Sequence, residues 1–347
     1  MNRLDKLYEL INRLNIEGII ISEFSNIFYF SKFTSEDCIL YVTKNQAYLI
    51  TDSRYTLQAK RQAQGFNVII RKGSYTDELK KLITGGKVLF EENISYSQYA
   101  SFTDNIDALF SSINIDYLRN IKETVEINKV KKATKIADKC YKHILTFVKA
   151  GMKETTVANE MIRYMKEQGA SKESFETIVA SGKRGALPHG AASNKVIKEG
   201  EFVTLDFGCI YKGYCSDITR SFMVGEASKE MIKIYNIVKR AQSLAIKTIK
   251  SGTKASDIDK VARDYIEKEG YGKYFIHSTG HGLGIAVHDP ISVSKSSDMI
   301  LEENMIITIE PGIYIPGMGG IRIEDDVLVK KDGYEVLTKA SKKLISI

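Results

Sequence analysis

Hydrophobic and polar positions along the chain follow two different periods. Residues 4–15 carry leucine and isoleucine at helical spacing with charged residues between them, which predicts an amphipathic helix. Short apolar runs separated by polar turns then predict strands. These runs span 18–21, 38–42, 47–50, 68–70 and 88–90. Helices are predicted near 76–83 and 97–109, with a further run around 114–118. Together they predict a small α/β domain over residues 1–119.

A second domain, over residues 120–347, contains an internal repeat. Two long helices are predicted, over about 122–149 and 227–250, and each leads into a shorter helical segment bounded by glycines. Strands carrying two carboxylates and one histidine follow each segment. The residues that match between the repeats are His189 with His288, Asp206 with Glu310, and Asp217 with Glu324. This predicts an α+β domain whose halves are related by a pseudo-two-fold axis.

The first pair of acids belongs to a predicted hairpin. Asp206 ends an apolar strand, the chain turns near 211–213, and Asp217 lies on the returning strand. A hairpin centred between 211 and 212 places Asp206 directly opposite Asp217. Two carboxylates so close together repel each other unless a cation lies between them, so the pair indicates a metal site.

The second pair of acids lies near the end of the chain. Glu310 ends another apolar strand, and Glu324 lies within the run 320–327. If this run is one strand, Arg322 and Glu324 share a face. The Arg322 guanidinium can then orient a neighbouring carboxylate through a forked hydrogen bond.

Histidines and prolines are concentrated in the same region. Four of the five histidines and all four prolines come after residue 187. His281 is surrounded by Gly280, Gly282 and Gly284, which favour a ligand on an irregular loop and disfavour a helical zinc pair with His277. We therefore expect His277 to support the site or to face substrate.

Four carboxylates and one imidazole form a donor set suited to two divalent cations. The candidate ligands are Asp206, Asp217, His281, Glu310 and Glu324. Four negative charges balance two divalent ions, and a bridging water would be acidified enough to act as a hydroxide nucleophile. This favours hydrolysis of a carbonyl substrate. A phosphoesterase is the alternative, although the sequence has no glycine-rich phosphate cradle.

Composition narrows the expected setting of the protein. The net charge of +7 comes from lysines spread over helical faces, and no basic stripe indicates a nucleic-acid partner. No secretory h-region and no apolar run long enough to span a membrane are present. The four cysteines show no C-x-x-C spacing, which favours reduced thiols and a cytoplasmic location.

At these residues the sequence resembles the pita-bread metallopeptidases, a family that includes aminopeptidase P, prolidase, methionine aminopeptidase and the non-metallic creatinase. The resemblance is dense over 120–347 and weaker over 1–119, which resembles the family's N-terminal domain. It rests on LPHGAASN (187–194), LDFGCIYKGYCSDITRSF (205–222), HSTGHGLGIAVHDP (277–290), TIEPGIY (308–314) and GIRIEDDVLV (320–329). Ser278 departs from the pattern, since glycine is frequent there.

The resemblance implies roles for particular residues. Asp206 and Asp217 would hold one metal ion, His281 and Glu310 the second, and Asp217 and Glu324 would bridge the two. Glu310 would also shuttle a proton. The implied catalytic residues are His189, His288 and Glu310, and the implied substrate-binding residues are His189, His277, His288 and Arg322.

The N-terminal domain and the intact ligand set favour an Xaa-Pro aminopeptidase or an Xaa-Pro dipeptidase. Such an enzyme would use two divalent ions, with manganese the first choice and cobalt or zinc acceptable. It would cleave proline-containing dipeptides or short peptides and form a homodimer. The alternatives are a catalytically silent binding protein that reuses the fold, and a specificity like that of methionine aminopeptidase.

Overall fold

The chain forms two compact units in the computed structural model, which describes residues 3–347. The first unit extends to Leu118 and the second spans Arg119–Ile347, so the division falls beside the predicted boundary after residue 119. Each unit has its own apolar interior, and two separate clusters of buried apolar residues lie in the second unit.

The first unit is built on a mixed six-stranded sheet with the strand order β4-β3-β2-β1-β5-β6. Its central strand β1 reads Gly-Ile-Ile-Ile and is buried throughout, as expected for a strand covered on both faces. The strands are β1 (Gly18–Ile21), β2 (Cys38–Thr43), β3 (Ala47–Thr51), β4 (Asn67–Ile70), β5 (Lys87–Glu91) and β6 (Leu109–Ile113). The helices are α1 (Arg3–Leu14), α2 (Phe24–Ser31), α3 (Thr56–Gln62), α4 (Tyr75–Leu82) and α5 (Tyr96–Asn105).

Three features of this unit differ from the sequence prediction. Helices α2 and α3 are additional to the predicted ones. Helix α2 reads FSNIFYFS and buries seven of its eight residues, so tertiary burial outweighs its weak helix propensity. The predicted helix near 97–109 ends at Asn105, because Leu109–Ile113 forms the edge strand β6. The run around 114–118 forms mainly a 3₁₀ turn at Asp116–Arg119.

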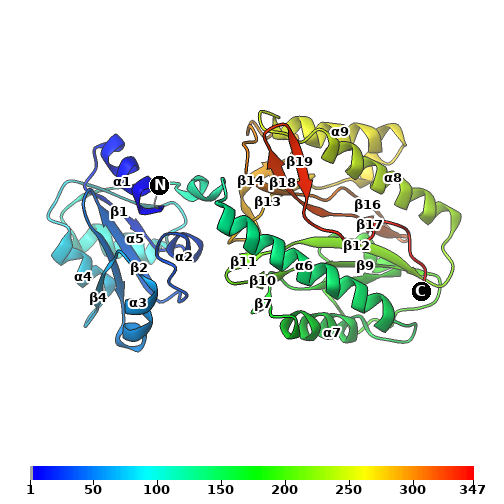
Figure 1. Cartoon of the computed structure of the whole chain (residues 1–347), viewed down its shortest axis with the longest axis horizontal. Helices are drawn as coiled ribbons and strands as arrows, with labels where there is room; N and C mark the ends of the chain where they lie inside the picture. Colours follow the sequence, from blue (N-terminus) through cyan, green and yellow to red (C-terminus); the bar gives the residue numbers. More distant parts are fainter. Residues whose placement is uncertain (1–2) are drawn as a thin grey trace. The chain divides into compact units, whose positions relative to one another are not determined.

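The second unit places strands between two pairs of helices (Figure 1). Its helices are α6 (Thr124–Phe147), α7 (Glu154–Glu167), α8 (Lys229–Lys247) and α9 (Ala255–Lys268). The strands of its first half are β7 (Lys172–Glu173), β8 (Ile178–Ser181), β9 (Glu201–Phe207), β10 (Cys209–Tyr211), β11 (Tyr214–Cys215) and β12 (Ile218–Val224). Those of its second half are β13 (Gly280–Gly282), β14 (Asp289–Val293), β15 (Ile306–Ile309), β16 (Gly312–Ile315), β17 (Gly319–Arg322), β18 (Asp325–Lys330) and β19 (Gly333–Val336).

The order of these elements repeats as the sequence predicts. In the first half β8, β9 and β12 form an antiparallel sheet that shares an apolar core with α6 and α7. In the second half β13, β15 and β18 form the equivalent sheet, which shares an apolar core with α8 and α9 and is extended by β14 and β19. Each of the unit's two cores belongs mainly to one half. The unit is therefore an α+β domain with an internal repeat.

Local geometry near the acids differs from the sequence prediction at three points. The hairpin pairs Asp206 with Thr219, so the predicted register with Asp217 opposite Asp206 is wrong by two residues. The turn closes at Lys212-Gly213, where both residues have positive φ. The run 320–327 is broken into β17 and β18, which belong to different sheets. His281 lies on the short strand β13 beside a β-bulge and not on an irregular loop.

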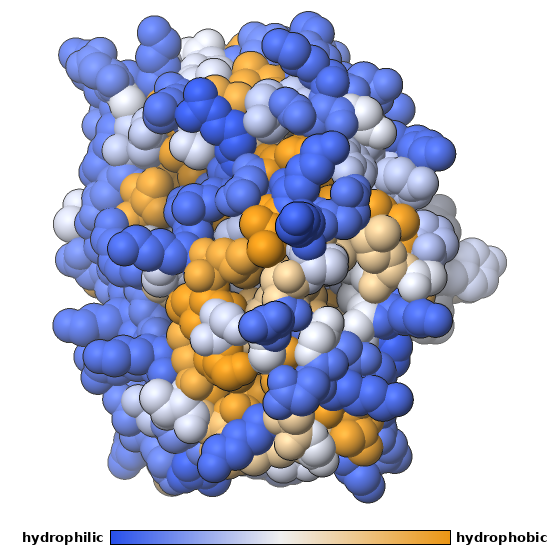
Figure 2. Space-filling view, turned by 90° about the vertical axis from the view of Figure 1, so that its right-hand side faces the viewer, coloured by the Kyte–Doolittle hydropathy of each residue, from blue (hydrophilic) through white to orange (hydrophobic). Residues whose placement is uncertain are grey.

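Polar residues dominate one face of the molecule, and apolar residues gather toward its middle (Figure 2). Large apolar side chains are nevertheless mostly internal, and the isoleucines of β15 are all buried. Within residues 3–347, no helix has the length and apolar character needed to cross a bilayer.

Candidate metal centre

One cavity of about 430 Å³ in the second unit is lined by all nine residues that the sequence suggests for the site. These residues are His189, Asp206, Asp217, His277, His281, His288, Glu310, Arg322 and Glu324. They come from distant segments, which the two sheets bring together. Phe175, Ile178 and Val287 add apolar surface to the same cavity, and Glu176 adds a further carboxylate.

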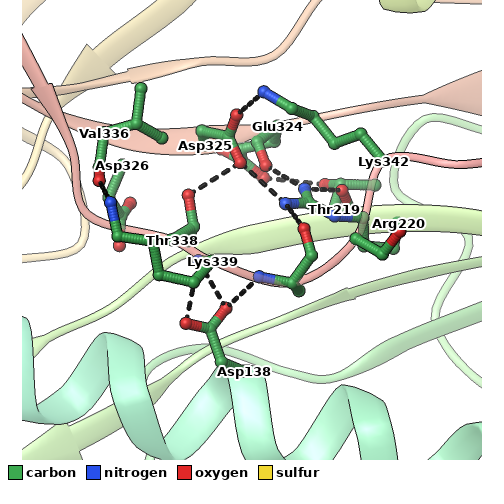
Figure 3. A network of polar contacts seen from close by, with 12 residues as sticks. Asp138, Thr219, Arg220, Glu324, Asp325, Asp326, Val336, Thr338, Lys339 and Lys342 are labelled. Atoms are coloured by element: carbon green, nitrogen blue, oxygen red, sulfur yellow. Dashed lines mark hydrogen bonds and ion pairs between the residues drawn. The ribbon is translucent and has the colours of Figure 1, made fainter.

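The four carboxylates stand where strands end or begin. Asp206 lies near the end of β9, Glu310 follows β15, and Asp217 and Glu324 immediately precede β12 and β18. Asp217 and Glu324 are buried, and the Thr219 hydroxyl donates a 2.7 Å hydrogen bond to Glu324 Oε2. The backbone N–H of Glu324 also donates to the Thr219 carbonyl oxygen, at 3.1 Å. Thr219 therefore joins the first half of the repeat to the Glu324 carboxylate of the second (Figure 3).

The His281 imidazole presents an unprotonated nitrogen to the acids. Its Nδ1 lies 3.0 Å from the carbonyl oxygen of Gly282, which can only accept, so Nδ1 carries the proton. Burial and the neighbouring His288 lower the pKa of His281 to about 4, so the ring is neutral near pH 7. Its Nε2 lies 3.6 Å from Asp217 Oδ2 and 3.5 Å from Glu310 Oε1. A bare nitrogen facing two carboxylates is the arrangement of a metal ligand.

Two observations show that this donor set fits divalent cations. Ligand atoms of Asp217, His281 and Glu324 all lie within 4.8 Å of one another. Among residues 3–347, Oδ1 of Asp206 and Oδ1 of Asp217 are buried and have no hydrogen-bond partner. Unpartnered buried carboxylate oxygens are costly, and a cation would satisfy them.

The pKa values of three of these acids are raised, because the acids are buried close to other negative charges. Burial and the charges of Glu324 and Asp206 raise the pKa of Asp217 well above its usual value. Burial and the nearby acids likewise raise the pKa of Glu324. Burial raises the pKa of Glu310 to about 8, although Arg322 opposes the shift. Divalent ions would reverse these shifts by stabilising the ionised carboxylates.

Arg322 organises the side of the site near Asp206. Its guanidinium pairs with Asp206, and its Nε donates to the Thr219 hydroxyl at 3.1 Å. Its Nη1 donates to the Tyr314 hydroxyl at 2.6 Å. The Tyr314 hydroxyl in turn lies 2.9 Å from Nε2 of His277. Nδ1 of the same histidine lies 2.8 Å from the Ser278 carbonyl oxygen. Hydrogen bonds thus run continuously from Asp206 to the His277 ring.

The loop that carries His189 is fastened at both ends by one buried carboxylate. Glu154, the first residue of α7, accepts hydrogen bonds from the N–H and hydroxyl of Ser181, both at 2.8 Å. Its other oxygen accepts from the N–H and hydroxyl of Ser193, at 3.1 and 2.7 Å, and pairs with Arg184. His189 itself is exposed to the cavity and to solvent. We call this arrangement the Glu154 clamp.

The segment that leads to His281 is fastened by a buried ion pair. Asp259 on α9 accepts from the Thr279 hydroxyl at 2.8 Å and pairs with Arg263, also at 2.8 Å. Arg263 donates to the carbonyl oxygens of Phe275 and His277, at 3.1 and 2.9 Å. We call this arrangement the Asp259–Arg263 clamp.

Sequence reasoning missed four residues that organise the site: Glu154, Thr219, Asp259 and Tyr314. For Thr219 a signal exists, since it lies two residues after Asp217 and so shares its face in an extended strand. Tyr314 ends the motif TIEPGIY but resembles any apolar strand residue. Glu154 and Asp259 lie on helices among many other charged residues, so only their burial reveals them.

Comparison with known proteins identifies the family. The model for metallopeptidase family M24 matches residues 128–331, and the model for the creatinase/prolidase N-terminal domain matches residues 3–123. The chain belongs to metallopeptidase family M24. It is therefore a metallopeptidase with a creatinase-type N-terminal domain and a pita-bread catalytic domain, as the resemblance predicts.

Three relatives match this peptidase over nearly its whole length. The solved structure of an Xaa-Pro dipeptidase from Bacillus anthracis is 44% identical, with a TM-score of 0.97 and 99% of each chain covered. The Xaa-Pro dipeptidase of Pyrococcus furiosus is 38% identical over 99% of each chain. The solved structure of an X-Pro aminopeptidase from Thermotoga maritima is also 38% identical, with a TM-score of 0.93 and 100% of each chain covered.

Proposed function

We propose that this metallopeptidase is a dinuclear-metal exopeptidase that hydrolyses the Xaa-Pro bond at the N-terminus of dipeptides or short peptides. The observation that carries the proposal is the single cavity lined by five ligand-type side chains and three further histidines. Relatives named for cleavage of Xaa-Pro dipeptides support the substrate class.

Five side chains would hold two divalent ions: Asp206, Asp217, His281, Glu310 and Glu324. Manganese is our first choice, and cobalt or zinc also suits oxygen and imidazole ligands. Bound ions would supply Lewis acidity and lower the pKa of water to near neutrality. In the metal-free protein, burial and the neighbouring acids raise the pKa values of Asp217, Glu310 and Glu324.

The remaining steps are carried by this chain's own side chains. Glu310 would take a proton from the attacking water and pass it to the proline nitrogen as the C–N bond breaks. In the metal-free protein burial raises the pKa of Glu310 to about 8, and bound ions would lower it by stabilising the carboxylate. His189 and His288 would donate hydrogen bonds to the substrate carbonyl oxygen as it gains negative charge. Such donors contribute about 3 kcal/mol each in related oxyanion sites.

His277 and Arg322 would border the substrate. Both line the cavity, and the Arg322 guanidinium is bonded to the Asp206 carboxylate and to the Tyr314 hydroxyl. The Tyr314 hydroxyl donates to the unprotonated Nε2 of His277, which holds the ring in one orientation. We propose that this fixed ring limits the shape of the residue accepted beside it.

The test is an assay with defined metals. The protein is stripped with a chelator, reloaded with manganese, cobalt or zinc, and given Xaa-Pro, Xaa-Pro-Yaa and Met-Ala-Yaa peptides. We expect metal-dependent release of the N-terminal residue from the proline peptides alone. Cleavage of Met-Ala-Yaa in preference to them would favour the methionine-aminopeptidase specificity. Failure to bind any of the metals or to cleave any Xaa-Pro peptide would refute the proposal.

We also propose that the protein is a homodimer, as the family resemblance implies. Light scattering on the purified protein tests this directly, and a monomer mass would refute it. A cytoplasmic location stays a prediction.

A further inference from the structure

Glu324 is followed in the chain by a buried acid that points away from the cavity. Asp325 is fully buried, and its carboxylate has different partners from the Glu324 carboxylate. Its Oδ1 accepts from Arg220 Nη2 and from the Thr338 hydroxyl, both at 2.7 Å. Its Oδ2 accepts from Gln242 Nε2 at 2.7 Å and pairs with Lys342.

Two of these partners belong to the segment after β19, residues 337–347, which we call the strap. Figure 3 shows Thr338 and Lys342 of the strap bonded to the Asp325 carboxylate. The Asp138 carboxylate on α6 accepts from the N–H groups of Lys339 and Ala340, at 2.8 Å each. Further along, the Met223 N–H donates to the Ile345 carbonyl oxygen at 2.9 Å. The strap is therefore bonded to elements of the first half as well as to Asp325.

Arg220 connects the strap to the metal ligand. It is fully buried, and its Nη2 also donates to the Ala340 carbonyl oxygen at 2.9 Å. Its Nη1 donates to the carbonyl oxygens of Thr219, at 2.9 Å, and of Glu324. The Glu324 backbone is thus held at its carbonyl by Arg220 and at its N–H by Thr219. The Asp325 carboxylate balances the charge of the Arg220 guanidinium, and the strap accepts a hydrogen bond from it at the Ala340 carbonyl oxygen.

We propose that the strap, through Lys342 and Thr338, positions Glu324 for metal binding. The inference rests on the proposed function, because it takes Glu324 as a metal ligand. Ligand distances tolerate errors of only about 0.2 Å, so a small backbone shift at Glu324 weakens binding. Groups that orient metal ligands typically affect affinity by about 10- to 100-fold when removed.

The experiment measures manganese binding by calorimetry on the full chain after treatment with a chelator. Lys342→Met and Thr338→Val each remove one strap contact to Asp325, and we expect each to weaken Mn²⁺ binding about tenfold, with a larger loss in the double variant. Lys342→Arg retains the charge and should bind nearly as well as the native chain. Lys343→Met alters the adjacent exposed lysine and should change nothing.

Two controls separate the possible failures. Unfolding midpoints measured in chelator report any loss of stability independently of the metal. If Lys342→Met and the double variant lower the midpoint but bind Mn²⁺ like the native chain, the strap is merely structural and the inference is wrong. Asp217→Ala, a change in the proposed ligand set, should abolish binding. If Asp217→Ala binds normally, the proposed metal centre itself fails, and the inference fails with it.

Discussion

In both halves of the catalytic unit a pair of antiparallel strands carries two acids, but the two strand pairs differ in register. In the first half the ladder sets Asp206 opposite Thr219, and Asp217 lies at the break before β12. In the second half the β15–β18 ladder ends immediately beside Glu310 and Glu324, which occupy its next position. An acid at a strand end is therefore visible in a sequence, whereas its partner across the hairpin depends on how the turn closes.

The halves also differ in how their histidine segments are held. The Glu154 clamp fastens both ends of a loop, 182–193, that carries His189 but no proposed metal ligand. The Asp259–Arg263 clamp fastens a segment that passes through His277 and continues directly into His281. One clamp should therefore affect substrate alone, while the other should affect substrate and metal together.

The largest expected effect tests whether both halves are needed for the metal centre. Asp217→Ala and Glu324→Ala should each lower kcat by at least about 1000-fold, because each removes a proposed bridging ligand. Steady-state kinetics with saturating manganese measures the loss, and circular dichroism checks the fold. Asp332→Ala, at an exposed turn, serves as the matched control. Retained turnover in either ligand variant would disprove the bridging role of that residue.

A smaller effect should separate the two clamps. In Glu154→Gln the new amide group, a hydrogen-bond donor, faces the N–H and hydroxyl donors of a serine, so one end of the His189 loop loses its bonds. We expect kcat/KM to fall about 10- to 100-fold with unchanged Mn²⁺ affinity. Asp259→Asn should weaken Mn²⁺ binding as well, because the Thr279 carbonyl oxygen accepts from the Glu310 N–H at 2.8 Å. Kinetics and calorimetry on both variants make the comparison. Equal losses of metal affinity would show that the clamps do not differ in this way.

The metal-free protein should become less stable as the pH rises from 6.5 to 8. Burial raises the Glu310 pKa to about 8, so over this range the folded protein retains a proton that the unfolded chain has lost. The neutral His281, whose pKa burial lowers to about 4, favours unfolding only below pH 6.5. Above pH 6.5 the Glu310 carboxyl group therefore determines the trend, and the free energy of unfolding falls by about 2 kcal/mol between pH 6.5 and 8 for this one group.

Urea unfolding at pH 6.5 and 8.0, in chelator and in manganese, measures this loss. Bound metal should remove or reverse it, because metal binding requires the ionised carboxylates and strengthens as pH rises. Stability that is independent of pH in chelator would contradict the assigned burial of the acids.

The smallest expected effect concerns Tyr314. Tyr314→Phe removes the hydroxyl that links Arg322 to His277, at a cost of about 1 kcal/mol, so kcat/KM should fall three- to tenfold. Tyr334→Phe, which changes an exposed tyrosine, is the control. An unchanged kcat/KM would show that His277 keeps its orientation without this hydroxyl.

Much of the fold was predictable because its signals are local. Apolar periodicity located the long helices of the catalytic unit, apolar runs located the strands beside its acids, and matching acids and glycines showed the repeat. Helix α2 was not predictable, because its aromatic sequence has weak helix propensity and is stabilised by burial against the rest of its unit. The break between β17 and β18 was also invisible, since the alternation of residues 320–327 continues through it.

The sequence by itself determined the chemistry available at the site. Four acids and a histidine, each at a strand end or beside glycines, predicted a metal-donor set, and all five line one cavity. Only the tertiary structure decided which groups hold these donors in place. Thr219 bonds to Glu324, Arg322 to Asp206, and Asp259 to the Thr279 hydroxyl before His281, across 20 to 116 residues of chain, and tertiary packing brings these groups together. Such contacts depend on register and packing, which no local pattern of residues encodes.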